Sequence, residues 1–146
     1  MAMILAFDPG VTTGWASYDQ KTRCYHIGHL GESLQGINRL ITMVQPDVVL
    51  YEDFKHRAQL ISSELYSLQV IGVLRLWLEE NPREQWHCLP AEAKAFWSDD
   101  KIKAIGLWER GKKHAMDAMR VLLTYMMKTD KEWASAQLQS LRQSGL

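Results

Sequence analysis

Three acidic residues and one histidine occupy positions from which they could share a metal site. Asp8 and Glu52 each close a short apolar run of the kind that forms a buried strand. His114 and Asp117 are three residues apart in a stretch of helical spacing, so both would project from one helix face. Carboxylate oxygens suit a hard cation such as Mg²⁺ or Mn²⁺. Two such ions about 3.5–4 Å apart, bridged by one carboxylate, could hydrolyse a phosphodiester.

Each of these residues also has an ordinary structural explanation when it is taken alone. Asp8-Pro9-Gly10 could simply start a turn, because proline fixes φ and glycine accepts positive φ. Asp117 could be a surface acid that pairs with Lys113 or Arg120, an interaction that contributes little to stability. His114 could be a solvated residue at a basic helix start. The order of the acids along the chain, two ending strands and one near a helix start, favours a shared site.

The elements that would position these residues alternate between strands and helices. Strands are predicted over Met3–Phe7, Gly14–Asp19, Arg23–Leu30, Asp47–Glu52 and Gln85–Leu89. Helices are predicted over Leu34–Val44, His56–Glu80, Ala91–Trp97 and Asp99–Glu109, with a core helix starting near Lys112 and a short packed helix beyond Thr129.

This order predicts a single α/β domain spanning residues 1–146, with a core of about 3–127 and a C-terminal tail of 128–146. Three antiparallel strands followed by two that are parallel to the first would form a mixed five-stranded sheet flanked by helices. The strands ending at Asp8 and Glu52 would then be neighbours. Two carboxylates so close together are unfavourable unless a cation or a proton lies between them.

The predicted helix His56–Glu80 has an apolar surface wider than one face of a sheet requires. Two interpretations are open: the extra apolar surface forms a dimer interface, or the helix is deeply buried within the monomer.

Composition excludes several classes of protein. The formal net charge is zero, so any surface that binds nucleic acid must be local. Cys24 and Cys88 form no metal-binding or redox motif, which fits a cytoplasmic setting. The first apolar run is too short for a signal peptide, and no run reaches the length of a membrane span, so we expect no membrane partner.

Basic residues gather on either side of the candidate acids. Seven Lys and Arg residues fall between positions 94 and 120: Lys94, Lys101, Lys103, Arg110, Lys112, Lys113 and Arg120. A second basic edge, Lys55, His56 and Arg57, directly follows Glu52. Either group could be an ordinary solvated face, or a rim that binds phosphates beside the acids.

Three motifs together resemble the RuvC-type Holliday-junction resolvases of the ribonuclease-H-like superfamily, especially the compact forms carried by bacterial viruses. The motifs are Asp8-Pro9-Gly10 with Thr13-Gly14, Glu52 with Phe54, and His114-x-x-Asp117-Ala118. The resemblance extends from Met3 to about Met127. It implies a homodimer that binds four-way DNA junctions and cuts two strands symmetrically, with two Mg²⁺ or Mn²⁺ ions in each active site.

The resemblance also implies roles for individual residues. Asp8, Glu52 and Asp117 would ligate metal, and His114 would be a ligand or a general base. Phe54 would stack near the junction centre, and Lys94 and Lys101 would contact the scissile backbone. The residues expected to contact DNA are therefore Phe54, Lys55, Arg57, Lys94, Lys101, Lys103, Lys112 and Lys113.

Other interpretations stay open at this point. Asp53 directly follows Glu52, where the bacterial enzymes often have an amide, so Asp53 is a further possible ligand. The loop from Asp8 to Gly14 is also similar to the phosphate loop of actin-like ATPases, but those need two related domains and we expect no nucleotide cofactor. A third possibility is a non-catalytic nucleic-acid or regulatory module of the same fold, as in the YqgF-type relatives.

Overall fold

The computed structural model describes residues 2–53 and 62–146. In chain order its elements are β1 (Met3–Asp8), β2 (Thr13–Asp19), β3 (Cys24–Leu30), α1 (Leu34–Val44), β4 (Val48–Glu52), α2 (Ser62–Glu80), β5 (Glu84–Cys88), α3 (Pro90–Lys94), α4 (Asp99–Ala104), α5 (Lys113–Thr129) and α6 (Lys131–Gln143). The predicted helical stretch before Ser62 lies outside the described residues.

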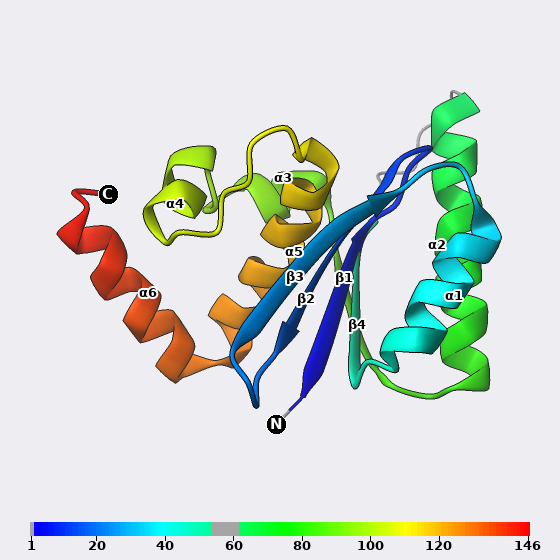
Figure 1. Ribbon diagram of the computed structural model, residues 1–146, viewed down its shortest axis with the longest axis horizontal. Helices are drawn as coiled ribbons and strands as arrows, with labels where there is room; N and C mark the ends of the chain where they lie inside the picture. The colour runs from blue at the N-terminus through cyan, green and yellow to red at the C-terminus, as the bar shows by residue number, and fades with distance from the viewer. Residues whose placement is uncertain (1, 54–61) are drawn as a thin grey trace.

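The five strands form one mixed sheet in the order β3-β2-β1-β4-β5. β1 is antiparallel to β2, and β2 is antiparallel to β3, whereas β4 and β5 run parallel to β1. Helices α1 and α2 cover one face, and α5 lies across the other with α3, α4 and α6 on the same side (Figure 1). The predicted mixed sheet of three antiparallel and two parallel strands is confirmed.

The sheet separates two apolar cores because alternate side chains of each strand point to opposite faces. Along β1, Leu5 and Phe7 enter the core shared with α1 and α2, whereas Ile4 and Ala6 enter the core shared with α5. All four side chains are almost completely buried. Coverage on both faces explains why the strand is a continuous apolar run.

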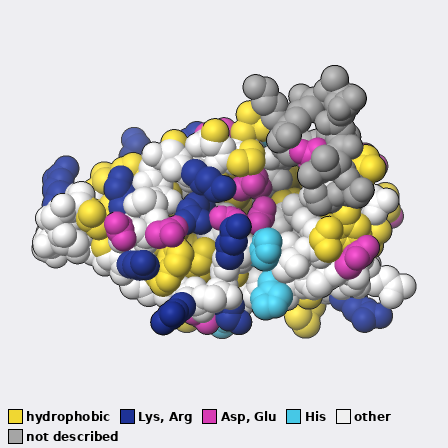
Figure 2. Space-filling model, turned by 90° about the horizontal axis from the view of Figure 1, so that it is seen from above, with side chains coloured by type: hydrophobic (Ala, Val, Ile, Leu, Met, Phe, Trp, Pro, Cys, Tyr) yellow, Lys and Arg dark blue, Asp and Glu magenta, His cyan; other side chains and the backbone are white. Residues whose placement is uncertain are grey.

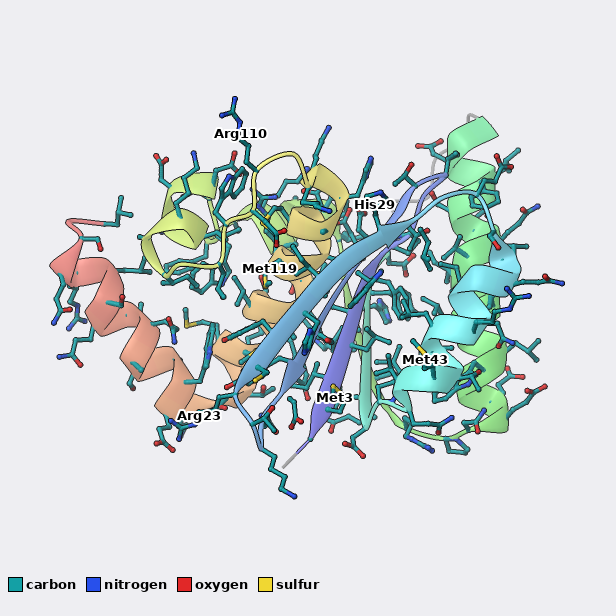
Figure 3. All side chains as sticks on the ribbon, viewed as in Figure 1. Met3, Arg23, His29, Met43, Arg110 and Met119 are labelled. Carbon is teal, nitrogen blue, oxygen red and sulfur yellow. The ribbon has the colours of Figure 1, made fainter. Side chains whose placement is uncertain are left out.

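Helix α5 is the central helix of its side of the molecule. Every residue from Ala115 to Met126 is buried except Asp117. Met119, for example, is buried in the core on this side of the sheet (Figure 3). This burial fixes the helix against β1 and β2, and therefore fixes the direction in which Asp117 points.

Helix α4 is shorter than the sequence predicted. The expected helix over Asp99–Glu109 ends at Ala104, because Gly106 adopts a φ of +79°. The amide of Leu107 then donates to the carbonyl of Ile102, and the amide of Gly106 donates to the carbonyl of Lys103, as in a Schellman cap. The chain from residue 105 to 112 is consequently a loop that leads into α5.

Some apolar residues of α2 are buried within the monomer, and others are exposed and could form a dimer interface. Val70 and Leu74 are completely buried against the sheet, whereas Leu65 is 50% exposed and Leu76 is 56% exposed. Deep burial therefore accounts for one side of the helix, whereas Leu65 and Leu76 are exposed on the other. Among the described helices, none is both long enough and apolar enough to cross a membrane.

Candidate functional site

Asp8 and Glu52 end two adjacent parallel strands on the same face of the sheet. The register pairs Phe7 with Tyr51, so the two acids follow one residue later on each strand. Because side chains alternate along a strand, both acids fall on the face that packs against α5. The two carboxylates are thus directed toward the start of that helix.

Helix α5 brings two further candidate ligands to these strand ends through a close contact with β2. A Cβ added at Gly14 would lie only 1.8 Å from the carbonyl oxygen of His114, so only glycine permits the approach. His114 Nδ1 lies 3.7 Å from Asp8 Oδ2. One ligand atom from each of Asp8, His114 and Asp117 lies within 4.8 Å of the others. Within the part of the chain that the structure describes, these three form the group that could hold a metal ion.

Glu52 lies beside this group rather than within it. Its Oε2 atom is buried, and none of the described residues donates a hydrogen bond to it. A buried carboxylate oxygen without a donor is unfavourable, because its hydrogen bonds to water are lost and no protein hydrogen bond replaces them. The donor set and this oxygen fit a hard cation bound between Glu52 and the group formed by Asp8, His114 and Asp117.

Burial and mutual repulsion raise the pKa values of the two strand-end acids. Burial raises the pKa of Asp8 to about 8, with further contributions from the charges of Glu52 and Asp117. Burial and the charge of Asp117 raise the pKa of Glu52 to about 7. The charge of Lys94 acts in the opposite direction on both acids. Without a cation, the site therefore retains protons near neutral pH.

These raised pKa values predict how the stability of the metal-free protein depends on pH. The unfolded chain releases the two protons near their ordinary pKa values of 3.8 and 4.5, whereas the folded protein releases them near 8 and 7. The folded state binds more protons throughout this window, so its stability falls as pH rises from about 4 to about 8. The melting temperature measured in EDTA should fall by several degrees across the window. Saturating Mg²⁺ should raise it more at high than at low pH, and an equal effect at both would contradict the prediction.

Two adjoining hollows meet at this cluster. One, of about 390 Å³, is lined by the loop after Asp8 and by the start of α5. The other, of about 570 Å³, lies between α3 and the loop before α5 and includes Trp97 and Trp108. Lys113 and Asp117 line both hollows. Figure 2 shows acidic side chains near the middle of this face, with Lys and Arg and then His beside them.

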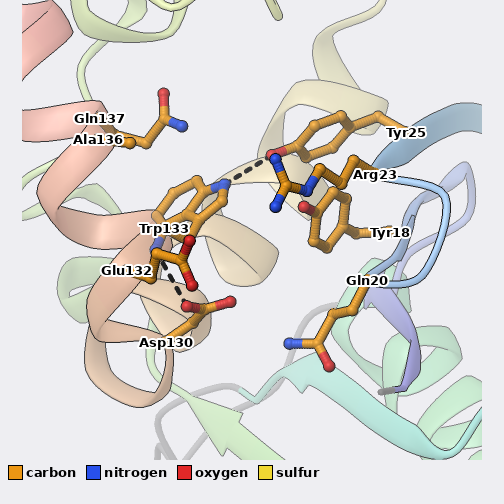
Figure 4. A pocket seen from close by; sticks show the side chains of 9 residues that line it. All are labelled: Tyr18, Gln20, Arg23, Tyr25, Asp130, Glu132, Trp133, Ala136 and Gln137. Carbon is orange, nitrogen blue, oxygen red and sulfur yellow. Dashed lines mark hydrogen bonds between the residues drawn. The ribbon is translucent and has the colours of Figure 1, made fainter.

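A third hollow lies at the other end of the sheet, where α6 docks on the β2–β3 hairpin (Figure 4). It has a volume of about 510 Å³. Trp133 Nε1 donates to the hydroxyl of Tyr25 at 2.8 Å, and the Trp133 amide donates to Asp130 Oδ1 at 3.0 Å. These contacts hold α6 in place, which confirms the short packed helix predicted beyond Thr129.

No protein-family model and no curated protein sequence matches this chain. Solved structures do match it. Thermus thermophilus RuvC in complex with a Holliday junction substrate has a TM-score of 0.69 at 16% identity, covering 90% of this chain and 97% of that one. The fold is ribonuclease-H-like. A second T. thermophilus RuvC structure gives 0.61 at 14% identity, covering 84% and 92%. The yeast mitochondrial Holliday junction resolvase Ydc2 gives 0.52 at 15%, covering 96% and 81%.

The ribonuclease-H-like fold distributes the predicted basic residues unevenly. Lys94, Lys112 and Lys113 line the 570 Å³ hollow beside the acids. Lys101 and Lys103 lie on α4, where their ammonium groups are 3.7 Å from the ring centre of Phe96 and 5.0 Å from that of Trp108. Neither α4 lysine is among the residues that line the hollows around the acids. Phe54, Lys55 and Arg57 lie outside the described residues.

Asp53, the further possible ligand, is turned away from the acidic cluster. Its Oδ2 lies 3.5 Å from His87 Nδ1 on β5, and His87 in turn stacks on Tyr51. Among the described residues, Asp53 does not belong to the group that could hold a metal. The next residue along a strand points to the opposite face, which accounts for its separation from Glu52.

Sequence reasoning missed two features of the site. Glu64 and Ser67, from α2, line the 390 Å³ hollow opposite His114, and nothing in their local sequence sets them apart. Arg120 was counted with the basic rim but is buried, with its side chain 10% exposed. Its ion pair with Asp117, at 2.8 Å, is the one that the ordinary structural interpretation of Asp117 predicted, because a spacing of three residues places both side chains on one helix face. The pair is largely buried and not at the surface, and this burial is the part that was missed.

Proposed function

We propose that this chain is a metal-dependent endodeoxyribonuclease that resolves four-way or other branched DNA junctions by hydrolysing phosphodiester bonds. The observation that carries the proposal is the convergence of Asp8, Glu52 and Asp117 from two strand ends and one helix, with His114 beside them. The fold shared with T. thermophilus RuvC, whose structure holds a Holliday junction substrate, gives further support. Similarity of fold alone would be a weak argument, because one fold hosts many functions.

In the proposed site, Asp8, Glu52, Asp117 and His114 hold two Mg²⁺ or Mn²⁺ ions. When bound, the ions would supply an activated water and stabilise charge on the leaving oxygen. Asp8 and Glu52 release the protons that their raised pKa values retain, so metal binding and proton release are coupled. His114 is 45% exposed, so its ring can accept a proton from the attacking water or act as a ligand.

Positive charge beside the acids would attract and orient the DNA backbone. Lys94 is close enough to lower the pKa values of both Asp8 and Glu52, and this proximity to the acids supports a contact between its ammonium group and the scissile phosphate. Lys112 and Lys113 extend this charge along the hollow. We assign backbone contacts to these three lysines and, from the resemblance, to Phe54, Lys55, Arg57, Lys101 and Lys103.

Symmetric cleavage of a junction requires two active sites, and we propose a homodimer as their source. Leu65 and Leu76, which are exposed on one side of α2, would supply apolar contacts for such an interface. A dimer would place one cluster of acids at each of two opposed DNA strands of the junction. Paired incisions in the same junction are the corresponding product.

The proposal is tested with end-labelled four-way, three-way and linear DNA of matched sequence, each incubated with Mg²⁺, Mn²⁺ or EDTA. We expect metal-dependent, symmetric incisions in opposed strands of the four-way junction and little cleavage of linear DNA. The Asp8→Asn variant serves as the disabled control. Equal cleavage of linear DNA would indicate an unselective nuclease. Junction binding without cleavage in either metal would instead favour the non-catalytic module.

A further inference from the structure

Arg120 occupies a buried position between the candidate site and helix α4. Its Nη1 donates to Asp117 Oδ1 at 2.8 Å, and its Nε donates to the carbonyl oxygen of Trp97 at 2.9 Å. Its Nη2 donates to Asp99 Oδ1. One guanidinium thus joins the acid of α5 to two points in the α3–α4 region.

The chemistry of this contact requires arginine in particular. A guanidinium is planar and presents its donors in fixed directions, so Arg120 satisfies three acceptors that lie on different sides of it. A lysine would keep the charge but could not reproduce this geometry. Because the Arg120 side chain is 10% exposed and that of Asp117 is 15% exposed, water cannot easily replace a lost contact.

The contact opposes a force that would otherwise displace Asp117. Its neighbours Glu52 and Asp8 are acids, and the charge of Asp117 raises the pKa of each of them. Above about pH 8, where Asp8 and Glu52 are ionised even without a cation, this repulsion favours rotamers of Asp117 that move its carboxylate away from the strand ends. The bond to Arg120 fixes Oδ1 and leaves Oδ2 for a cation. The charge of Arg120 also lowers the pKa of Glu52, so it favours the ionised form of a second acid.

We propose that Arg120 is a positioning residue that holds Asp117 in the orientation needed to bind metal, with Asp99 and the Trp97 carbonyl holding Arg120 in turn. The inference rests on the proposed function only in that Asp117 binds a metal ion. It assigns α4 a role in the site although α4 contributes no ligand. Ser98 caps α4 through the amide of Lys101, and this cap fixes the first turn from which Asp99 projects.

The test measures the affinity of the full-length protein for Mn²⁺ alone, by electron paramagnetic resonance, without DNA. Arg120→Lys keeps the positive charge but removes the planar guanidinium and its fixed donors. We therefore expect Mn²⁺ affinity to fall about tenfold, as when a residue that orients a metal ligand is replaced. Asp99→Asn should weaken Mn²⁺ binding about threefold, because a neutral amide oxygen is a poorer acceptor than a carboxylate. Asp100→Asn is the matched control: Asp100 is exposed in the same helical turn, and its replacement should leave the affinity unchanged.

Melting temperatures of all variants are measured in parallel to separate positioning from folding. Wild-type Mn²⁺ affinity in a folded Arg120→Lys protein would overturn the inference. If that variant does not fold, Asp99→Asn decides instead, and an affinity equal to that of Asp100→Asn would overturn it. Absence of Mn²⁺ binding to the wild-type protein would also overturn it. Because the readout is metal affinity, failure of the wild-type protein to cleave junctions would count against the proposed function and not against the role of Arg120.

Discussion

Replacing Asp8 with Asn is expected to abolish junction cleavage and, in the same protein, to stabilise the metal-free fold at high pH. If Asp8 is the metal ligand we propose, its loss removes several kcal/mol of transition-state stabilisation, so cleavage should fall by at least about a thousandfold. In contrast to the loss of cleavage, the stability of the metal-free protein should increase at high pH. Asp8 is only 15% exposed, and burial raises its pKa to about 8, so folding opposes its ionisation. The neutral amide removes that opposition.

The difference in melting temperature between Asp8→Asn and the wild-type protein should depend on pH. Near pH 4 the folded wild-type protein holds its proton on Asp8, and the variant should have a similar melting temperature. Near pH 8 the variant should melt several degrees higher in EDTA and should gain less from added Mg²⁺. Calorimetry at both pH values, together with cleavage of the labelled four-way junction, measures both effects. A variant that melts below the wild type at high pH would show that Asp8 is not under electrostatic strain.

Gly14→Ala is expected to have the largest effect on structure and site together. The new Cβ would lie 1.8 Å from the carbonyl oxygen and 2.1 Å from the carbonyl carbon of His114, and both are backbone atoms that no rotamer change can move. Either β2 or the start of α5 must shift, which costs about 3 kcal/mol or more. A shift of α5 would carry His114 and Asp117 away from Asp8. Cleavage and Mn²⁺ affinity should both be lost.

Gly31→Ala provides the matched control for this substitution. Gly31 is an exposed residue between β3 and α1, its φ is not positive, and a Cβ added there meets nothing within 4 Å. Replacing glycine by alanine where the backbone permits it stabilises a protein by about 0.4–1 kcal/mol, so this variant should melt slightly above the wild type and cleave normally. Circular dichroism melts and the junction assay compare the two variants. If Gly14→Ala folds and cleaves like Gly31→Ala, the close contact between β2 and α5 does not hold the site.

The sheet and the pair of strand-end acids could be predicted because their signals are local. The apolar run before Asp8 and the run ending at Glu52 indicated strands covered on both faces, and strand periodicity then placed both carboxylates on one side. The i, i+3 spacing of His114 and Asp117 supplied the helix. The structure brings Asp8, His114 and Asp117 together and leaves Glu52 at their side. The roles assigned to these residues stay predictions.

The contacts that could not be predicted depend on positions far apart in the chain. The partners of Arg120 on the α3–α4 side are separated from it by 21 and 23 residues, and nothing in the sequence directs a guanidinium to the carbonyl of Trp97. Glu64, near the start of α2, and the loop after Asp8 line the same hollow although they are more than 50 residues apart in the chain. The early end of α4 also escaped prediction, since one glycine in a left-handed conformation overrides an otherwise helical stretch.

The contact between Gly14 and His114 has a consequence for synthesis of the protein on the ribosome. Domains fold as units while the chain emerges from its N-terminus, and all five strands are made before α5 exists. Asp8 and Glu52 are then present, but Asp117 and the helix that seats against Gly14 are not. The group of Asp8, His114 and Asp117 therefore assembles only after α5 has been made. A chain that ends before α5 holds only two of the three acids, and we expect it not to bind metal at this position.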